Sequence, residues 1–423
     1  MVQVGDMTVK SAETTAAAAR LLERCDAVAA FSEQPGRIIR RFLSAPVGPL
    51  HDRLAGWFRD AGMAVRTDAV GNLIGRRPAS DPPDGRPAKT LLIGSHIDTV
   101  PDAGRYDGVV GVLAGLALVE LLAGRRMPYS IEVIAFSEEE GVRFATPYIG
   151  SLAAAGRFDP ALLAKTDAAG VTLEQAIRGF GLDPAGIPAA AYRPDDLMGY
   201  FEIHIEQGPV LESQNLPVAL VEAIAGQSRL WVSFHGQAGH SGTCPMEHRR
   251  DALAAAADLV TDVERTARTT PGLRATVGCL SVEPGATNVV PGRARMSLDV
   301  RHADDSVRLR ALGDLLRNAQ AYAQVRRLRF EIESRTDQPA VPADRRLGDL
   351  LADCLGDTGL PALRMLSGAG HDAAVMASVA PMCMLFVRSP GGISHHPDEA
   401  VNADDVAAAL EVATRFLRRL AER

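Results

Sequence analysis

Five short polar clusters containing His, Asp or Glu stand next to apolar runs of the sequence. Open α/β sheets place functional side chains at such strand ends. The clusters are residues 94–99 (GSHIDT), 106–108 (YDG), 137–141 (SEEEG), 204–208 (HIEQG) and 394–397 (SHHP). Each one alone is more typical of a solvated loop or a helix N-terminus. Together they offer three His and two carboxylate positions, which predicts a transition-metal centre for Zn²⁺ or Mn²⁺, with Co²⁺ and Ni²⁺ as further candidates.

The chemistry of such a centre is hydrolysis. A bridging carboxylate can hold two cations about 3.5–4 Å apart, and the pair acidifies a shared water and polarises a carbonyl group. A neighbouring carboxylate that is not a ligand can then move a proton from the water to a leaving nitrogen. Adjacent Glu residues can divide these tasks, because consecutive side chains point in different directions. Asp98, two residues after His96, is a candidate for fixing the orientation of that imidazole.

The composition argues against several classes of function. A net charge of −7 over 423 residues argues against nucleic acid as a partner. No apolar run reaches the ~18–20 residues of a membrane span, so no membrane partner is expected. The Ala-rich stretch 15–30 is interrupted by charged residues and predicts an amphipathic helix, not a signal peptide. Five dispersed Cys without a CxxC motif indicate reduced thiols and a cytoplasmic location.

The apolar patterns predict the elements that must position these clusters. Short apolar runs alternate with helical patterns in the first half of the chain, which is typical of a largely parallel sheet covered on both faces. Helices are expected at 12–31, 49–62, 109–123 and 147–156, and strands at 90–95 and 131–136. The pattern returns from about residue 337, with helices at 345–358 and 402–421 around a strand at 382–387.

The middle of the chain follows a different order. A strand at 229–235 and a helix at 249–269 are followed by strands at 274–282 and 293–301, a helix at 305–325 and a strand at 327–334. This β-α-β-β-α-β order is the ferredoxin-like arrangement of four strands with two helices on one face. We therefore expect an α/β domain in two pieces, 1–212 and 337–423, with a smaller α+β domain of residues 213–336 inserted between them.

The motifs, in this order, resemble those of the peptidase M20 superfamily. They are most similar to its hydantoinase/carbamoylase branch, which includes allantoate amidohydrolases, N-carbamoyl-L-amino-acid hydrolases and β-ureidopropionases. The matching segments span essentially the whole chain: GSHIDTV, YDG, EEEG, HIEQGP, GQAGHSG, NVVPG, LDVR, GAGHD and SHHPDE. The resemblance implies a metallopeptidase-like catalytic domain with a mostly parallel sheet, and an inserted ferredoxin-like lid and dimerisation domain. HIEQG is the most specific segment, because related peptidases usually have a carboxylate at the position of His204.

The resemblance also implies two metal sites. The ligand positions that carry over are His96, Asp107 and His204 for one divalent ion, and Asp107, Glu140 and His395 for the other, with Asp107 bridging. Glu139 carries over as the general acid/base, because the paired Glu of this branch directly precede Gly141. Glu138 is then left as a solvated or capping charge, although it remains the competitor of Glu139. His396 stands where an Asn is usual and remains the competitor of His395.

A second set of residues is implied for the substrate. The resemblance assigns His240 to stabilising the oxyanion, and Asn288 and Arg301 to the substrate carboxylate, which a guanidinium fork binds through both oxygens. Further substrate-binding positions are Gln207, Gly370 and His371. In this branch the inserted domain forms the interface of a homodimer and closes over the site. His240, Asn288 and Arg301 therefore act either in their own chain or across the dimer.

The implied substrate is a small carboxylate with a ureido or carbamoyl group. Allantoate, N-carbamoyl-L-amino acids and ureidopropionate all fit this description. Residues 102–106 (DAGRY) are more similar to allantoate-type members and favour allantoate. Gly239, Ser241 and Cys244 stand where many relatives have Asn, Ala and Thr, which bears on fine specificity and not on the class of reaction.

Other classes of function fit the sequence less well. The GxSxG elbow of a serine hydrolase does not occur. A GxGxxA pattern at residues 368–373 lacks the βαβ unit of a dinucleotide site. A non-catalytic binding protein of the same fold is the alternative from another class. Metal content after purification discriminates the two, because a protein that has lost the chemistry has no need of the ligands.

Overall fold

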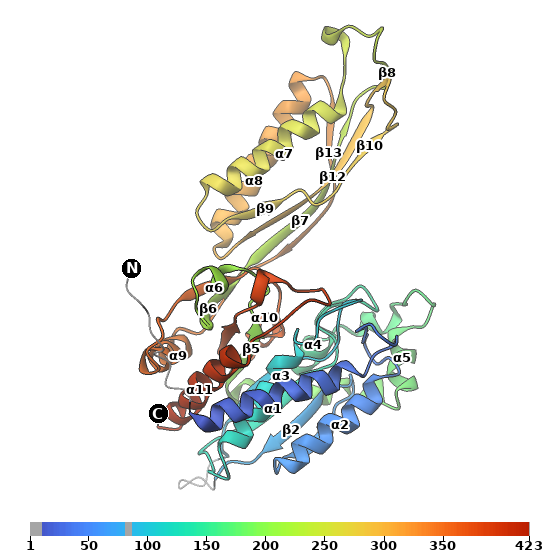
Figure 1. The fold of residues 1–423 in the computed structure, drawn as a ribbon. Coiled ribbons are helices and arrows are strands. Elements are labelled where there is room, and N and C mark those ends of the chain that lie inside the picture. The colour runs from blue at the N-terminus through green and yellow to red at the C-terminus, as the bar shows by residue number, and fades with distance from the viewer. Residues whose placement is uncertain (1–10, 81–86, 423) are drawn as a thin grey trace. The chain divides into compact units, whose positions relative to one another are not determined.

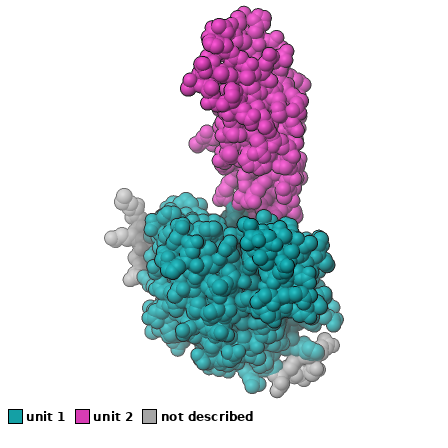
Figure 2. Space-filling view, turned by 90° about the vertical axis from the view of Figure 1, so that its right-hand side faces the viewer, with its two compact units in different colours: residues 1–222, 343–423 teal, residues 223–342 magenta. Residues whose placement is uncertain are grey.

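The computed structural model describes residues 11–80 and 87–422 of the chain. The chain divides into two compact units, each of which is described by itself (Figure 2). Unit 1 comprises residues 1–222 and 343–423, and unit 2 comprises residues 223–342. None of the described helices is both long and apolar enough to cross a bilayer. All five Cys are free thiols.

A mixed sheet runs through unit 1 (Figure 1). Among the described residues its strand order is β1-β2-β4-β3-β5-β16-β6, with β15 beside β6; the two-residue strand β14 pairs with Ala223 and Ile224 at the end of β6, and all four of these residues belong to unit 2. The central strands β4, β3, β5 and β16 run parallel to one another, whereas β1, β2 and β6 pair in antiparallel fashion. The bounds are β1 Ala64–Thr67, β2 Leu73–Arg77, β3 Thr90–His96, β4 Ser130–Phe136, β5 Leu197–Ile205, β6 Val218–Ile224, β14 Val341–Pro342, β15 Arg364–Ser367 and β16 Met382–Val387. The fold is therefore mixed α/β with a mostly parallel centre.

Helices cover the faces of this sheet, so that β3, β4 and β16 are buried along their whole length. Helices α1, α2, α3, α9 and α11 share one large apolar core with the sheet. Helices α4 and α5 belong to a second, smaller core. The bounds are α1 Ala12–Ala29, α2 Val47–Asp60, α3 Val109–Leu121, α4 Ile149–Ala154, α5 Leu173–Gly179, α6 Val210–Ser213, α9 Arg345–Asp357, α10 Asp372–Met376 and α11 Ala403–Leu420.

The start of α3 places a candidate ligand close to a second one. The helix is apolar on all sides, and every residue of it except Glu120 is buried. Gly108, directly before it, has a φ of 67°, and a Cβ at this position would lie 2.6 Å from the ring of His96. Both features require glycine. The YDG motif therefore brings Asp107 against His96.

Unit 2 is an antiparallel sheet with two helices on one face (Figure 1). The strand order is β10-β12-β7-β13, with β9 also paired to β12. Buried and partly exposed residues alternate along β12, as expected for a sheet with one covered face. A short pair, β8 with β11, stands apart from this sheet. The bounds are β7 Gly226–His235, β8 Gly239–His240, α7 Ala252–Thr269, β9 Arg274–Thr276, β10 Leu280–Glu283, β11 Val289–Val290, β12 Arg293–His302, α8 Asp305–Val325 and β13 Arg329–Gln338.

Two expectations about elements need correction. The single strand expected over 274–282 is wrong, because the chain leaves β9 at Thr276 and re-enters the sheet as β10 only at Leu280. Strand β6 was not expected at all, and it pairs with β16 at the edge of the larger sheet. The long helices of unit 1 and its strands β3, β4 and β16 lie where the apolar patterns predict them, with ends that differ by a few residues, whereas β1, β2, β5 and β15 were not expected either.

Candidate metal centre

The predicted ligands come from segments that the parallel strands bring to one edge of the sheet. His96 is the last residue of β3, and His204 is the penultimate residue of β5. Glu139 and Glu140 follow β4. His395 lies in the loop after β16, the next strand of the same row. Because parallel neighbours end at the same edge, these side chains converge there, as expected for an open α/β sheet.

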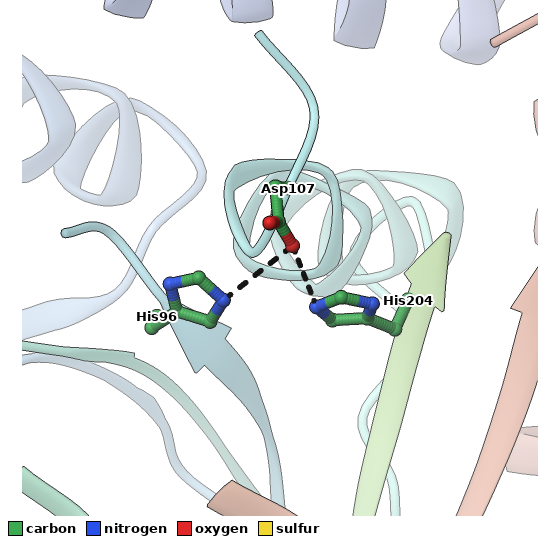
Figure 3. A group of neighbouring side chains, drawn as sticks. All are labelled: His96, Asp107 and His204. Carbon is green, nitrogen blue, oxygen red and sulfur yellow. Dashed lines mark ion pairs between the residues drawn. The ribbon is translucent and has the colours of Figure 1, made fainter. Parts of the chain in front are cut away.

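Asp107 lies between the two buried imidazoles (Figure 3). Its Oδ1 atom is 3.2 Å from His204 Nε2 and 3.7 Å from His96 Nε2. The two rings are stacked, with centroids 5.8 Å apart. All three side chains are at most 4% exposed, yet Asp107 Oδ1 accepts no hydrogen bond of good geometry. Two imidazole nitrogens converge on a buried carboxylate oxygen that accepts no hydrogen bond. These three ligand atoms fit a divalent cation.

The second oxygen of Asp107 faces a different pair of ligands. His395 Nε2 is 3.1 Å from Asp107 Oδ2 and 3.4 Å from Glu140 Oε1. One potential ligand atom from each of these three residues lies within 4.8 Å of those of the other two, and the same holds for the group around Oδ1. The carboxylate of Asp107 thus has one oxygen in each group. This is the arrangement of a carboxylate that bridges two cations.

Hydrogen bonds fix which nitrogen of each buried imidazole faces Asp107. His96 Nδ1 is 3.0 Å from the carbonyl oxygen of Asp98, and His204 Nδ1 is 3.0 Å from that of Ile205. In the neutral rings these Nδ1 atoms donate, which leaves both Nε2 atoms as ligands. The carboxylate of Asp98 accepts the main-chain N–H groups of Glu139 at 2.9 Å and Glu140 at 3.1 Å. Asp98 therefore ties the segment of His96 to that of the two Glu residues.

The charges of the cluster compensate one another. Burial would raise the pKa of Asp107, but His204, His395 and His96 outweigh it and hold this pKa well below its usual range. Burial would lower the pKa of His204, but Asp107 raises it above the ordinary value. Burial also raises the pKa of Glu140 to about 7. The imidazoles and carboxylates thus stabilise one another's charged forms, and ligand groups of this kind lose their protons when divalent cations bind.

The first two Glu of the acidic triplet after β4 are buried, and Glu140 is partly buried. Glu139 is 8% exposed, and burial raises its pKa well above the usual value. Glu139 and Glu140 group with His96 as possible ligands. Of the two roles left to Glu138, that of a solvated charge is wrong, because its side chain is fully buried, whereas its Oε1 accepts the N–H of Val142 at 3.1 Å, as a capping charge does. Burial and the neighbouring Asp98 raise the pKa of Glu138 as well.

The two consecutive His residues of the last cluster differ in position. His395 faces Asp107 and Glu140, as described above. The ring of His396 lies 3.6 Å from the carboxylate of Asp398, accepts the N–H of that residue, and belongs to none of the possible ligand groups of the described chain. His395 has a φ of 55°, a left-handed conformation that is uncommon for a residue with a side chain.

The predicted substrate residues of unit 1 lie in three different environments. Gln207 Nε2 donates to Asp107 Oδ2 at 3.1 Å, so this amide lies at the edge of the cluster. Gly370 lies beside the general-base candidate, since a Cβ there would be 3.8 Å from Glu139 Oε1. The ring of His371 is 2% exposed, bonds Ser367 at 2.7 Å and packs 4.5 Å from the ring of His204. The imidazole of His371 is therefore buried and packs against the proposed metal ligand His204.

The predicted residues of unit 2 lie on its surface. His240 in β8 is exposed, and its Nδ1 accepts the N–H of Gly242 at 3.1 Å. The neutral ring therefore carries its proton on Nε2, which suits a hydrogen-bond donor to an oxyanion. Asn288 lies next to it, because its carbonyl oxygen accepts the N–H of Ser241. Arg301 forms a two-pronged ion pair with Asp299, with both distances 2.7 Å.

Unit 2 separates these residues into two groups. His240 pairs with Val289 close to the start of β12, whereas Arg301 is near the end of that strand and pairs with Arg274 of β9. Eight residues separate the start of β12 from Arg301, which corresponds to about 26 Å of extended strand. Figure 1 shows β8 and β9 toward opposite ends of the unit. A small molecule cannot contact both groups within one copy of unit 2.

Two further carboxylates next to the cluster were not predicted. Glu202 is fully buried and accepts hydrogen bonds from Ser95, from Tyr200 and from the main chain of Ala373. A carboxylate inside a mostly apolar segment is the signal that could have pointed to it. Glu399 is 5% exposed and accepts the main-chain N–H groups of Tyr106 and Asp107. It belongs to the segment SHHPDE, whose last residue carried no assigned role.

Comparison with known proteins decides the family. Residues 92–419 match peptidase family M20/M25/M40. The chain belongs to this family. It is 38% identical to the N-carbamoyl-L-amino acid amidohydrolase of Geobacillus stearothermophilus over 95% of this chain and 98% of that protein. It is also 38% identical to the allantoate deiminase of Arabidopsis thaliana, over 86% of this chain and 75% of that protein.

A solved structure leads to the same branch of the family. The chain superposes with a TM-score of 0.89 on an amidase of the hydantoinase/carbamoylase family from Burkholderia multivorans, at 32% identity and with 96% and 98% of the two chains covered. The curated relatives are named as hydrolases of C–N bonds outside peptide linkages. The family member described here is thus a hydrolase of this amidohydrolase type, and the relatives' names divide over the substrate.

Proposed function

We propose that the protein is a two-metal amidohydrolase that releases ammonia and CO₂ from allantoate, leaving a ureidoglycine-type product. The observation that carries the proposal is the position of Asp107, whose two oxygens face two separate sets of ligand atoms. One divalent ion would be bound by His96, Asp107 and His204, and the other by Asp107, Glu140 and His395. The mixed imidazole and carboxylate donors favour Zn²⁺ or Mn²⁺, with Co²⁺ or Ni²⁺ as alternatives.

The residues around the ligands would carry the proton transfers. When bound, the two cations supply the Lewis acidity that activates water and polarises the substrate carbonyl. Glu139 takes the proton from that water and delivers it to the leaving nitrogen. Its raised pKa in the absence of cations reflects burial next to other carboxylates, and two cations would favour its ionised form. His240 donates through Nε2 to the oxygen that becomes negatively charged.

The substrate carboxylate accounts for a further group of side chains. Arg301 and Asn288 would bind it, together with the amide of Gln207 beside the cluster and the segment of Gly370 and His371. The segment 102–106 favours allantoate. N-carbamoyl-L-amino acids are the second candidate, because the Geobacillus relative with that name matches nearly the full length of both chains. A ureidopropionate is the third.

The working form would be a homodimer joined through unit 2. The support is the length of about 26 Å from the start of β12, close to His240 and Asn288, to Arg301, which a small substrate cannot bridge within one unit. In a two-fold dimer each site can receive one group from each protomer. Five free thiols support the cytoplasm as its location.

A substrate panel tests the proposed function. The protein is stripped with a chelator, reloaded with Mn²⁺ or Zn²⁺ and supplied with allantoate, N-carbamoyl-L-amino acids and N-carbamoyl-β-alanine, and ammonia is measured. We expect metal-dependent release from allantoate. Rapid cleavage of N-carbamoyl-L-amino acids without turnover of allantoate would move the assignment to the second candidate. A purified protein that refuses divalent metal would instead be the non-catalytic binding protein of this fold.

A further inference from the structure

Glu399 connects two of the loops that carry proposed ligands. Its Oε1 accepts the main-chain N–H of Tyr106 at 2.9 Å and that of Asp107 at 3.0 Å. Its Oε2 accepts the hydroxyl of Ser394 at 3.0 Å, the residue directly before His395. The side chain is 5% exposed, and all these contacts lie within unit 1. One buried carboxylate thus bonds the backbone of the bridging residue and the neighbour of the last ligand.

The packing around Glu399 leaves its carboxylate little freedom. A Cβ at Gly104 would lie 2.3 Å from both the Cβ and Oε1 of Glu399, so the loop before Asp107 rests directly on this side chain. The N–H of Glu399 bonds the carbonyl oxygen of His396 at 3.0 Å and closes the turn that follows His395. The side chain and the backbone of Glu399 therefore both act on the His395 loop.

The two loops differ in how strongly they are anchored without Glu399. Asp107 lies two residues before the first residue of α3, and its carbonyl oxygen accepts the N–H of that residue, Val109, at 2.7 Å. His395 lies in a loop and has a φ of 55°, which the surrounding contacts must maintain. Ser394 and the turn to Glu399 are among those contacts. Loss of the carboxylate should therefore release His395 more than Asp107.

We propose that Glu399 is a positioning residue that holds His395 at the correct distance from Asp107 for the second metal site. This inference rests on the proposed two-metal function. Glu399 belongs to none of the possible ligand groups of the described residues, and its two oxygens accept the three hydrogen bonds described. Partners of this kind around metal ligands typically change metal affinity by about 10- to 100-fold when they are removed.

The test is a calorimetric titration of the chelator-stripped, full-length protein with Zn²⁺ and with Mn²⁺. His395→Ala and His204→Ala serve as references for loss of the second and of the first site. Glu399→Ala should weaken binding at the site that His395→Ala removes by about 10- to 100-fold, and change the other site by less than about 3-fold. Glu399→Gln should recover most of the loss, because its amide oxygen still accepts both main-chain N–H groups.

Glu132→Ala is the matched control. Glu132 is also a buried Glu of unit 1, at 2% exposure, but it bonds Arg66, Arg76 and Tyr192 instead of the ligand loops. It should lower the melting temperature and leave both affinities unchanged. Should Glu399→Ala fail to fold, Ser394→Ala removes only the contact at Oε2, and a smaller loss at the same site is expected.

Several results would overturn the inference. These are unchanged binding in Glu399→Ala, an equal loss at both sites, and a Glu399→Gln variant as defective as the Ala variant, which would assign the effect to charge and not to position. Failure of the proposed function has a different signature. A wild-type protein that binds two ions but hydrolyses none of the panel contradicts the proposed reaction and leaves the positioning role testable by titration alone.

Discussion

The proposed metal ligands of unit 1 and the proposed substrate residues of unit 2 are held in different ways. In unit 1, His96, Asp107 and His204 are buried, and hydrogen bonds fix the orientation of both rings. In unit 2, His240 and Asn288 are exposed, and Arg301 is bound to Asp299 of its own strand. One region is preorganised for a cation within a single chain. The other presents donors that require a partner surface or a substrate to converge.

This difference separates two tasks of a hydrolase. Cations need a rigid, convergent donor set, and burial of that set keeps it dry and correctly spaced. Recognition of a substrate tolerates mobile parts, because closure around the substrate can assemble them at the moment of binding. Mutations in the two regions should therefore have separable effects on metal content and on kinetics.

The largest expected effect comes from Glu139→Gln in unit 1. The variant should bind both metals and lose about 10²- to 10⁴-fold in kcat, because it removes the general base and leaves the ligands in place. Ammonia release and metal analysis of the same preparation measure the two quantities. Glu138→Gln is the matched control and should retain most activity. If the two variants exchange behaviour, Glu138 is the base.

The next effect concerns His240 in unit 2. His240→Ala should lower kcat by about 10²- to 10³-fold through loss of one oxyanion donor. Metal content should not change, and a loss of metal would contradict the separation of tasks.

Mixing the two inactive variants tests whether His240 acts across the dimer. Heterodimers of Glu139→Gln and His240→Ala contain one intact site if His240 serves the partner's metals, and co-expression should restore about a quarter of the wild-type activity per chain. If His240 serves its own chain, both sites of the heterodimer are defective, and the mixture stays inactive.

A smaller effect is expected for Arg301→Ala. Loss of a charged two-pronged contact should raise KM for carboxylate substrates by about 10- to 100-fold, with less effect on kcat. Arg301→Lys should recover only part of the loss, because an ammonium cannot bind both oxygens in one plane. Asp299→Asn tests whether the ion pair matters for substrate binding, since Asp299 holds the guanidinium of Arg301 in place. Loss of metal from Arg301→Ala would show that the assigned role is wrong.

The last pair of predictions concerns stability, which should change with pH differently in the two units. Burial lowers the pKa of His51 in unit 1 to about 4, below its ordinary 6.5. The unfolded state then binds the proton more tightly than the folded state. The stability that His51 contributes is complete above pH 6.5 and is lost as the pH falls toward 4, by about 3 kcal/mol. Thermal melting of His51→Phe should show a weaker pH dependence over this range.

The stability of unit 2 should change only at lower pH than that of unit 1. Hydrogen bonds from Ser233 and Arg295 lower the pKa of Glu333 to about 2, from an ordinary value of 4.5. Its contribution is therefore present above pH 4.5 and is lost as the pH falls through 2. Hydrogen exchange between pH 7 and 4 should weaken protection in unit 1 first. Earlier loss of protection in unit 2 would contradict this order.

Much of the candidate site follows from local sequence, and the reason is geometric. Polar clusters after apolar runs mark strand ends, and parallel strands bring such ends together, so that His96, His204 and the Glu pair could be predicted to converge. The burial of Glu138 could not be predicted, because it depends on contacts beyond its own segment. The same holds for Glu399, whose partners Tyr106 and Asp107 lie almost three hundred residues away in the chain.

Contacts between distant residues also limited how much of the fold could be predicted. The long helices and the buried strands β3, β4 and β16 carry strong apolar patterns, either periodic or continuous, and were predicted. Strand β6 was missed, and the break between β9 and β10 was not foreseen, because strand edges depend on pairing partners more than on their own residues. Arg301 and Asp299 lie two positions apart on the same side of β12. Their ion pair occupies the guanidinium that is proposed to bind the substrate carboxylate.

Metal analysis of wild type and Asp107→Asn tests the central claim most directly. The protein is stripped, reloaded with Zn²⁺ or Mn²⁺, desalted and analysed for metal per chain. We expect two equivalents in the wild type and a severe loss of both in Asp107→Asn, because the carboxylate of Asp107 has one oxygen in each ligand group. A wild type with at most one equivalent, or an Asp107→Asn variant that keeps two, would contradict the bridged two-metal site.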